Sequence, residues 1–143
     1  MQKELQTFYF TIITPPLIFF IILYLADFFD VMFKLGSGSH YIEIGLLGMA
    51  VLLAFVVPMW YRILFVKKVK GRRFVEKELF MKFQKSFLMI SQSTLYIALL
   101  AFYLQTSKWI MFTIVLLTLY ALYFYYPSEK RIESEKKLFK VRE

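Results

Sequence analysis

The stretch WIMFTIVLLTLYALYFYY, residues 109–126, decides the fold class, because eighteen consecutive positions carry no Asp, Glu, Lys or Arg. A helix of roughly 20 apolar residues crosses the hydrocarbon core of a bilayer. Three further stretches share this apolar character, at residues 8–29, 44–61 and 87–106. The sequence therefore predicts four membrane-spanning segments.

Composition supports the same class. The 143 residues are 59% hydrophobic and 20% aromatic, more apolar material than a soluble core of this size can bury. The alternating ten-residue strands of a membrane barrel are absent, and a backbone in lipid must then be helical. We predict an all-α integral membrane protein, a single domain over residues 1–143. Its four transmembrane helices should form an antiparallel bundle packed in chain order.

Basic residues fall almost entirely on one side of the predicted spans. The loop 62–86 holds nine Lys and Arg, the tail 127–143 holds six, and Lys3 precedes the first span. Only Lys34 and Lys108 belong to the other side. Because basic residues concentrate in cytoplasmic loops, we expect an N-in, C-in protein of the plasma membrane, of a composition typical of a bacterial inner membrane. Attraction to anionic headgroups accounts for the net charge of +8, and we expect no nucleic-acid partner.

Both cytoplasmic segments have amphipathic patterns. Val75, Leu79 and Phe83 recur at i, i+4 and i+8, which predicts a short helix lying on the inner leaflet. In the tail, Ser128 is a helix N-cap candidate, and Ile132 shares a face with Phe139. These segments are either helix ends attracted to lipid or a docking surface for a cytoplasmic partner.

Several chemistries are excluded by what the sequence lacks. There is no cysteine, so disulfides, thiol redox reactions and thiolate metal sites are ruled out. No Asp, Glu, Lys, Arg or His lies in the central part of any span, which removes the usual proton carriers. Phosphate-binding loops are missing, and the single histidine, His40, has no nucleophile motif beside it. We therefore expect neither an enzyme nor a cofactor.

Acidic residues and the histidine gather near the predicted outer loop. Asp27, Asp30, His40 and Glu43 could form an outward-facing metal or proton site from oxygen and imidazole ligands. The alternative is a pair of solvated helix ends, with Ser39 capping the second helix and Glu43 stabilised near its N-terminus.

Proline and hydroxyl residues lie at matching depth in the cytoplasmic third of the spans. Each proline removes the hydrogen bond to the carbonyl four residues earlier. We expect the Ser, Gln and Thr side chains of residues 91–94 in the third span to satisfy these carbonyls; the alternative is a polar cavity open to the cytoplasm. The residues assigned to this site are Thr11, Pro15, Pro16, Pro58, Ser91 and Thr94.

Gln92 points in a different direction from the small residues of the third span. At 100° per residue it lies roughly 145° from their mean direction, on a face shared with Tyr96 and Tyr103. We predict that these three residues contact another polypeptide, either a second copy or a different membrane protein. The alternative is that the first or fourth helix covers this face. The small residues that should pack the second span against the third are Ala50, Ala54, Pro58, Ser91, Thr94, Ala98, Ala101 and Gln105.

The hypotheses on function follow from the lack of recognisable catalytic groups in the sequence. The first hypothesis is a non-enzymatic accessory, scaffold or immunity-type protein that binds other membrane proteins. The alternative is a small solute channel or transporter with a cytoplasm-facing polar cavity. A third class, a lipid-modifying enzyme, would use the outer carboxylates. A continuous polar path would favour the channel, and a closed bundle with an outward polar face would favour the binding protein.

Overall fold

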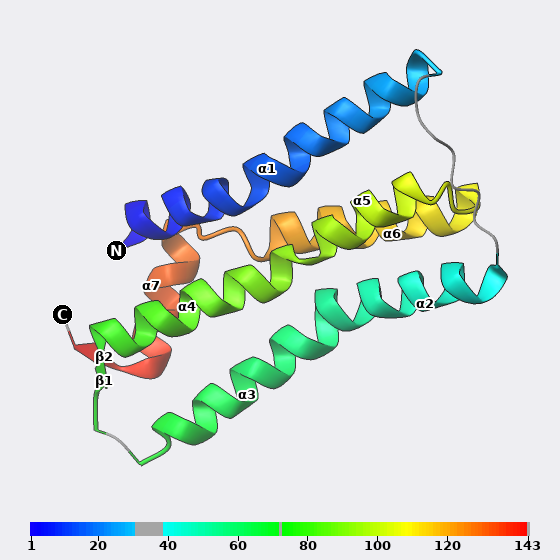
Figure 1. Ribbon diagram of the computed structural model, residues 1–143. Coiled ribbons are helices and arrows are strands. Elements are labelled where there is room, and N and C mark those ends of the chain that lie inside the picture. Colours follow the sequence, from blue (N-terminus) through cyan, green and yellow to red (C-terminus); the bar gives the residue numbers. More distant parts are fainter. Residues whose placement is uncertain (31–38, 72, 143) are drawn as a thin grey trace.

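A computed structural model describes residues 1–30, 39–71 and 73–142 (Figure 1). The chain is 84% helical, which confirms the all-α class. The elements, in chain order, are α1 (Gln2–Phe28), α2 (His40–Val51), the π-helical turn η1 (Leu52–Val56), α3 (Val57–Val69), β1 (Val75–Glu76), α4 (Lys77–Gln92), α5 (Thr94–Tyr103), α6 (Lys108–Phe124), α7 (Glu129–Phe139) and β2 (Val141–Arg142).

Within the described residues, three helices are long and apolar enough to cross a membrane. They are α1, the continuous helix His40–Val69 and the continuous helix Lys77–Tyr103. A fourth exists only if α6 and α7 are counted together, and these two are bent by 69° at their junction. The count of three to four agrees with the apolar segments expected from the sequence.

The predicted cytoplasmic loop 62–86 is mostly helical, because the helices on both sides extend into it. Helix α3 runs to Val69, and Gly71 turns the chain at a φ of 90°, a conformation that favours glycine. Helix α4 then starts at Lys77 and continues into the third apolar segment. The amphipathic stretch is therefore not a separate helix on a membrane surface. Its apolar residues Val75 and Phe83 are buried against other parts of the chain.

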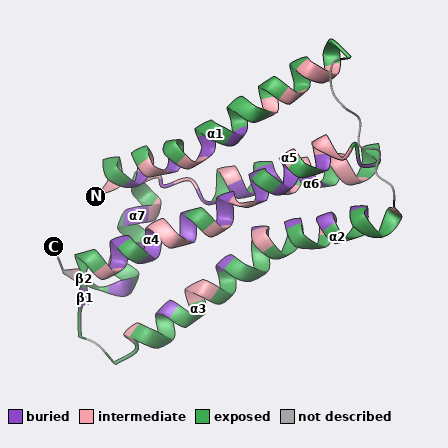
Figure 2. Cartoon of the chain, viewed as in Figure 1, coloured by how far each residue is buried: buried purple, intermediate pink, exposed green. Residues whose placement is uncertain are grey.

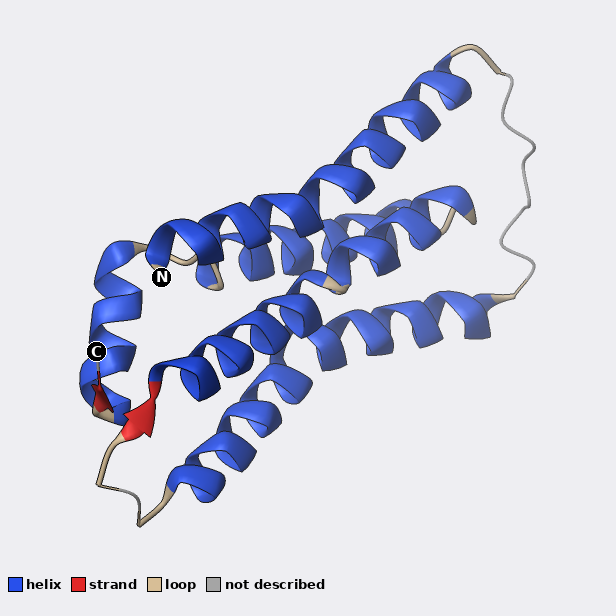
Figure 3. Ribbon diagram, turned by 60° about the vertical axis from the view of Figure 1, so that its left-hand side comes forward, coloured by secondary structure: helices blue, strands red, loops and turns tan. Residues whose placement is uncertain are grey.

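The helix formed by α4 and α5 is the centre of the arrangement. It packs against α1 on one side, against α2, η1 and α3 on the other, and against α6 (Figures 1 and 3). Among the described residues, α1 makes no extensive contact with α2, so the bundle does not follow chain order. Burial explains this: α4 is buried over a wide arc, whereas α1 buries only the narrow stripe Leu5, Tyr9, Ile13 and Pro16 (Figure 2).

Both termini and the turn between α3 and β1 lie at one end of the helices (Figure 1). We call this the basic end, because the basic turn and tail are there. The C-terminal ends of α1 and α5 lie at the opposite end of the helices. This distribution is what the predicted N-in, C-in topology requires.

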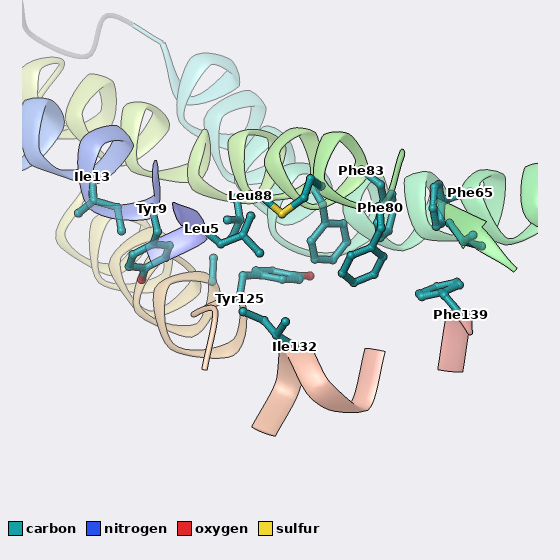
Figure 4. Close-up of a cluster of buried hydrophobic side chains, with 14 of the residues drawn as sticks. Leu5, Tyr9, Ile13, Phe65, Phe80, Phe83, Leu88, Tyr125, Ile132 and Phe139 are labelled. Atoms are coloured by element: carbon teal, nitrogen blue, oxygen red, sulfur yellow. The ribbon is translucent and has the colours of Figure 1, made fainter. Parts of the chain in front are cut away.

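The basic end has a core of its own. Helix α7 turns back so that Phe139 lies beside Phe65, Phe80 and Phe83, with ring centroids 5.2 to 6.1 Å apart (Figure 4). The short strands β1 and β2 pair in parallel just beyond it. Ser128 caps α7 as predicted, its hydroxyl accepting from the Arg131 N–H at 3.4 Å. The tail is thus packed on its own chain.

Candidate functional site

At the end of the helices opposite the basic end, the side chain of Glu43 connects the N-terminus of α2 to the N-terminus of α6. Its carboxylate is buried, and Oε1 accepts a 2.8 Å hydrogen bond from the backbone N–H of Ser107, the N-cap of α6. A negative charge is stabilised beside a helix N-terminus. His40 Nδ1 lies 3.9 Å from Glu43 Oε2. Ser39 caps α2 as predicted, accepting from Tyr41 N–H at 3.3 Å.

The four predicted metal ligands do not form one cluster. Asp27 Oδ1 accepts from Gln105 Nε2 at 3.4 Å, an exposed contact between the end of α1 and the end of α5. Within the described ranges, no three His, Cys, Asp or Glu residues could hold a metal ion. Asp27 and Asp30 end one helix, while His40 and Glu43 begin another, so the helix-end interpretation describes these residues better.

Pro58 is the second residue of α3, one position beyond the end of η1, and the carbonyl that it leaves without a helical donor is bonded from the end of α6. The wider turn of η1 lets the Leu52 carbonyl accept from the Val57 N–H. The Ala54 carbonyl, which Pro58 cannot serve, accepts a 2.8 Å hydrogen bond from the Tyr125 hydroxyl. The expectation that the third span supplies this donor was wrong.

The hydroxyls of the third span instead bond to their own helix. Ser91 Oγ donates to the Phe87 carbonyl at 2.8 Å, and Thr94 Oγ1 donates to the Ser91 carbonyl at 3.1 Å. Helical Ser and Thr often bond back to a preceding carbonyl in this way. They therefore do not reach the kinks at Pro15, Pro16 or Pro58.

The cavity beside Pro16 is apolar. It has a volume of about 150 Å³. Its lining comprises Pro16, Leu17, Phe20, Leu95, Ala98, Leu99, Val115, Thr118, Leu119 and Leu122. Cavities with such walls stay dry, because a buried water needs several polar partners. This part of the bundle therefore does not supply the polar cavity that a transporter would need.

Gln92 lies inside the bundle and not on an outward face. Its side chain is 1% exposed, and neither Oε1 nor Nε2 has a hydrogen-bond partner. Tyr96, by contrast, is 51% exposed, and Tyr103 is half-buried. The predicted shared contact face of these three residues was wrong. The helical projection assumed one packing neighbour, whereas α4 and α5 are covered on several sides. Burial of Gln92 within its own chain agrees with the alternative, in which another helix of the chain covers this face.

The register between α1 and the central helix places Gln92 at the level of the α1 carbonyls that Pro15 and Pro16 leave without their helical donors. Lys85 Nζ bonds Glu4 Oε1 at 2.6 Å, and further along the helices the rings of Phe20 and Phe102 lie 5.1 Å apart. Counted from either contact, Gln92 falls at the level of residues 10 and 11 of α1. Pro16, which denies the Ile12 carbonyl its donor, is buried on the same interface.

A cluster of polar side chains, largely buried, holds α7 against α4 and the end of α6. Glu135 accepts from Gln84 Nε2 of α4 and lies 3.6 Å from Arg131 Nε. Arg131 Nη1 donates to the carbonyls of Phe124 and Tyr126 at 3.3 and 3.4 Å. Burial lowers the pKa of the Arg131 guanidinium, and the charge of Glu135 opposes this shift. Sequence reasoning missed this cluster, whose only signal was the i, i+4 spacing of Arg131 and Glu135.

The outward side of α1 carries a shallow, open groove formed by residues of this helix alone. Its lining consists of Thr7, Phe10, Thr11, Thr14, Pro15, Ile18 and Phe19. The three threonine hydroxyls donate to carbonyls of their own helix at 2.7 to 2.9 Å. They therefore present small, methyl-bearing surfaces. Pro15 has no N–H for the Thr11 carbonyl, which leaves that acceptor without its intrahelical donor.

Comparison of the chain with protein-family models, with curated proteins and with solved structures finds no match. The contacts and surfaces described above are the basis for assigning a function.

Proposed function

We propose that this chain is a multi-pass protein of the plasma membrane that acts without catalysis, as an accessory, scaffold or immunity-type partner of another membrane protein. The apolar helices support membrane insertion, and the collection of both termini and the basic turn at one end supports an N-in, C-in orientation. In this proposal α6 is the fourth crossing, and α7, which is bent by 69° away from α6, lies in the cytoplasm.

The side of α1 that does not contact its own chain is the main observation behind the proposed partner binding. This helix contacts its own chain through one narrow stripe, and only 17% of its most apolar window is buried. Small residues such as Thr7, Thr11 and Thr14 let a second helix approach closely, which is how membrane helices associate in lipid. A donor from that helix could also satisfy the Thr11 carbonyl. We therefore place the partner helix in the groove of α1.

A small solute channel or transporter is the alternative function. One observation favours it, because Gln92 is a buried amide without a partner near the middle of the central helix. Against it, the cavity between α1, α5 and α6 is small and apolar. Solute flux into vesicles containing the purified chain would support this alternative, and Gln92→Leu should then abolish the flux.

Topology is tested by single cysteines, which the cysteine-free chain allows without background. Cysteine at Gly71 or Ser134 should be protected from an impermeant thiol reagent added to intact cells. Cysteine at Lys108 should react. Labelling at Ser134 or Gly71 in intact cells would contradict the orientation, and extraction of the chain by carbonate without detergent would contradict membrane insertion.

Partner binding is tested by filling the groove. Thr11→Phe should remove a co-purified membrane protein while leaving the melting temperature of the isolated chain unchanged. Thr113→Phe is the matched control, because Thr113 is exposed on α6 and its hydroxyl also donates to its own helix, at 2.9 Å. Retention of the partner by Thr11→Phe, or its equal loss from both variants, would exclude the α1 groove.

A further inference from the structure

A second groove lies between α3 and α4 at the basic end, with a volume of about 250 Å³. Helix α3 contributes Tyr61, Leu64, Phe65 and Lys68, and helix α4 contributes Leu79, Lys82, Phe83 and Ser86. The partner helix proposed for α1 does not occupy this groove.

The floor of the groove is a stack of aromatic rings. Phe65 and Phe83 lie 3.9 Å apart with nearly parallel rings, and Tyr61 stacks on Phe83 at 5.6 Å. Phe65 and Phe83 are buried, so neighbouring side chains hold them in place. The apolar floor of the groove is therefore made of rings that are packed in place before any ligand binds.

Two cations meet at this groove from facing helices. Lys68 and Lys82 are both exposed, and among the described residues neither is paired with a carboxylate. The neighbouring Lys85 differs, because its Nζ is 2.6 Å from Glu4 Oε1. Like charges brought to one groove repel each other, and an anion placed between them is attracted to both. The charge of the groove thus selects an anionic ligand.

The two lysines lie toward the basic end of the groove, and Tyr61 and Ser86 lie toward the predicted membrane, as the headgroup and acyl chains of a lipid require. Lys68 lies seven residues beyond Tyr61, about 10 Å along α3 toward the basic end. Tyr61 and Ser86 lie at the predicted border of the membrane, where residues 44–61 end and residues 87–106 begin. The cationic end therefore faces the headgroup region and the aromatic end faces the acyl chains.

We propose that this groove binds one anionic phospholipid of the cytoplasmic leaflet. The phosphate lies between Lys68 and Lys82, and an acyl chain follows Leu64 and Tyr61 toward the bilayer. Basic pockets between helices on the cytoplasmic side are suited to such headgroups. This assignment rests on the membrane location proposed above.

The test uses the full chain purified in a mild detergent. Phosphatidylglycerol should raise the melting temperature of the wild type, and phosphatidylcholine should not, because bound ligand stabilises the folded state. Lys68→Gln combined with Lys82→Gln should weaken the phosphatidylglycerol affinity by roughly tenfold to thirtyfold, since each lysine contributes about 1 kcal/mol to such binding. Lys130→Gln combined with Lys137→Gln, on the exposed side of α7, is the matched control with equal charge loss.

Three outcomes would overturn the lipid site. They are unchanged phosphatidylglycerol affinity in the groove variant, equal loss in the tail control, and equal stabilisation by glycerol phosphate, which would indicate a soluble phosphate ligand. Lys68→Arg combined with Lys82→Arg should keep the affinity, which separates loss of charge from loss of fold. Flotation with vesicles tests the membrane location by itself. If the wild type fails to float, the membrane proposal fails; if all variants float without lipid selectivity, only the lipid site fails.

Discussion

The hydroxyl of Tyr125 donates a 2.8 Å hydrogen bond to the carbonyl of Ala54, the acceptor that Pro58 leaves without its helical donor. The two residues are 71 positions apart in the chain. This contact joins the end of α6 to the kink in the helix His40–Val69 and replaces a local bond by a tertiary one.

A double-mutant cycle tests this replacement. Tyr125→Phe should lower the free energy of unfolding by about 1–3 kcal/mol, because a buried acceptor loses its donor. Pro58→Ala alone should leave the chain at least as stable, and the new backbone N–H at position 58 should reduce the cost of Tyr125→Phe. Unfolding in detergent measures all four variants. Equal costs of Tyr125→Phe in the two backgrounds would show that the carbonyl of Ala54 does not depend on this hydroxyl.

The two buried glutamines of α4 should respond in opposite ways to the same substitution. Gln92→Leu should raise the free energy of unfolding by about 1 kcal/mol, because it removes an amide that has no partner. Gln84→Leu should lower it, since Gln84 Nε2 donates to the buried Glu135. Thermal unfolding compares the variants. A clear loss of stability in Gln92→Leu would contradict an unpaired amide at this position.

Glu43 should act as a hydrogen-bond acceptor that holds the starts of α2 and α6 together. Glu43→Leu should cost about 1.5–3 kcal/mol, the range for hydrogen bonds to a charged group, whereas Glu43→Gln keeps an acceptor and should cost less. His40→Ala is the control, because the His40 side chain is 76% exposed. A cost for His40→Ala equal to that of Glu43→Leu would mean that the pair acts as a unit.

The packing of the tail on the basic end depends on Phe139. Phe139→Ala should release α7, because truncating a buried phenylalanine typically costs about 3–5 kcal/mol. Limited trypsin digestion should then cleave rapidly after Lys136 and Lys137. Leu138→Ala, at a side chain that is 63% exposed, should leave the tail protected. Equal cleavage rates in wild type and Phe139→Ala would contradict the docked tail.

What the sequence determined by itself is local. Charge-free runs such as residues 109–126 predicted the apolar helices, since length and composition within one segment decide that property. Ser39 and Ser128 were identified as helix caps because a cap needs only its own hydroxyl and the next turn. The one-sided distribution of Lys and Arg likewise predicted which ends lie together.

The tertiary structure alone decided which helix faces which. Gln92 is buried, and Ser91 serves its own helix, because α4 and α5 are surrounded by three neighbours that no single-segment pattern specifies. The donor for Ala54 comes from Tyr125, and Phe139 fills the basic end, through contacts between segments distant in the chain. Helical periodicity defines directions around one axis only. The phase and register between axes come from side-chain packing across the whole bundle.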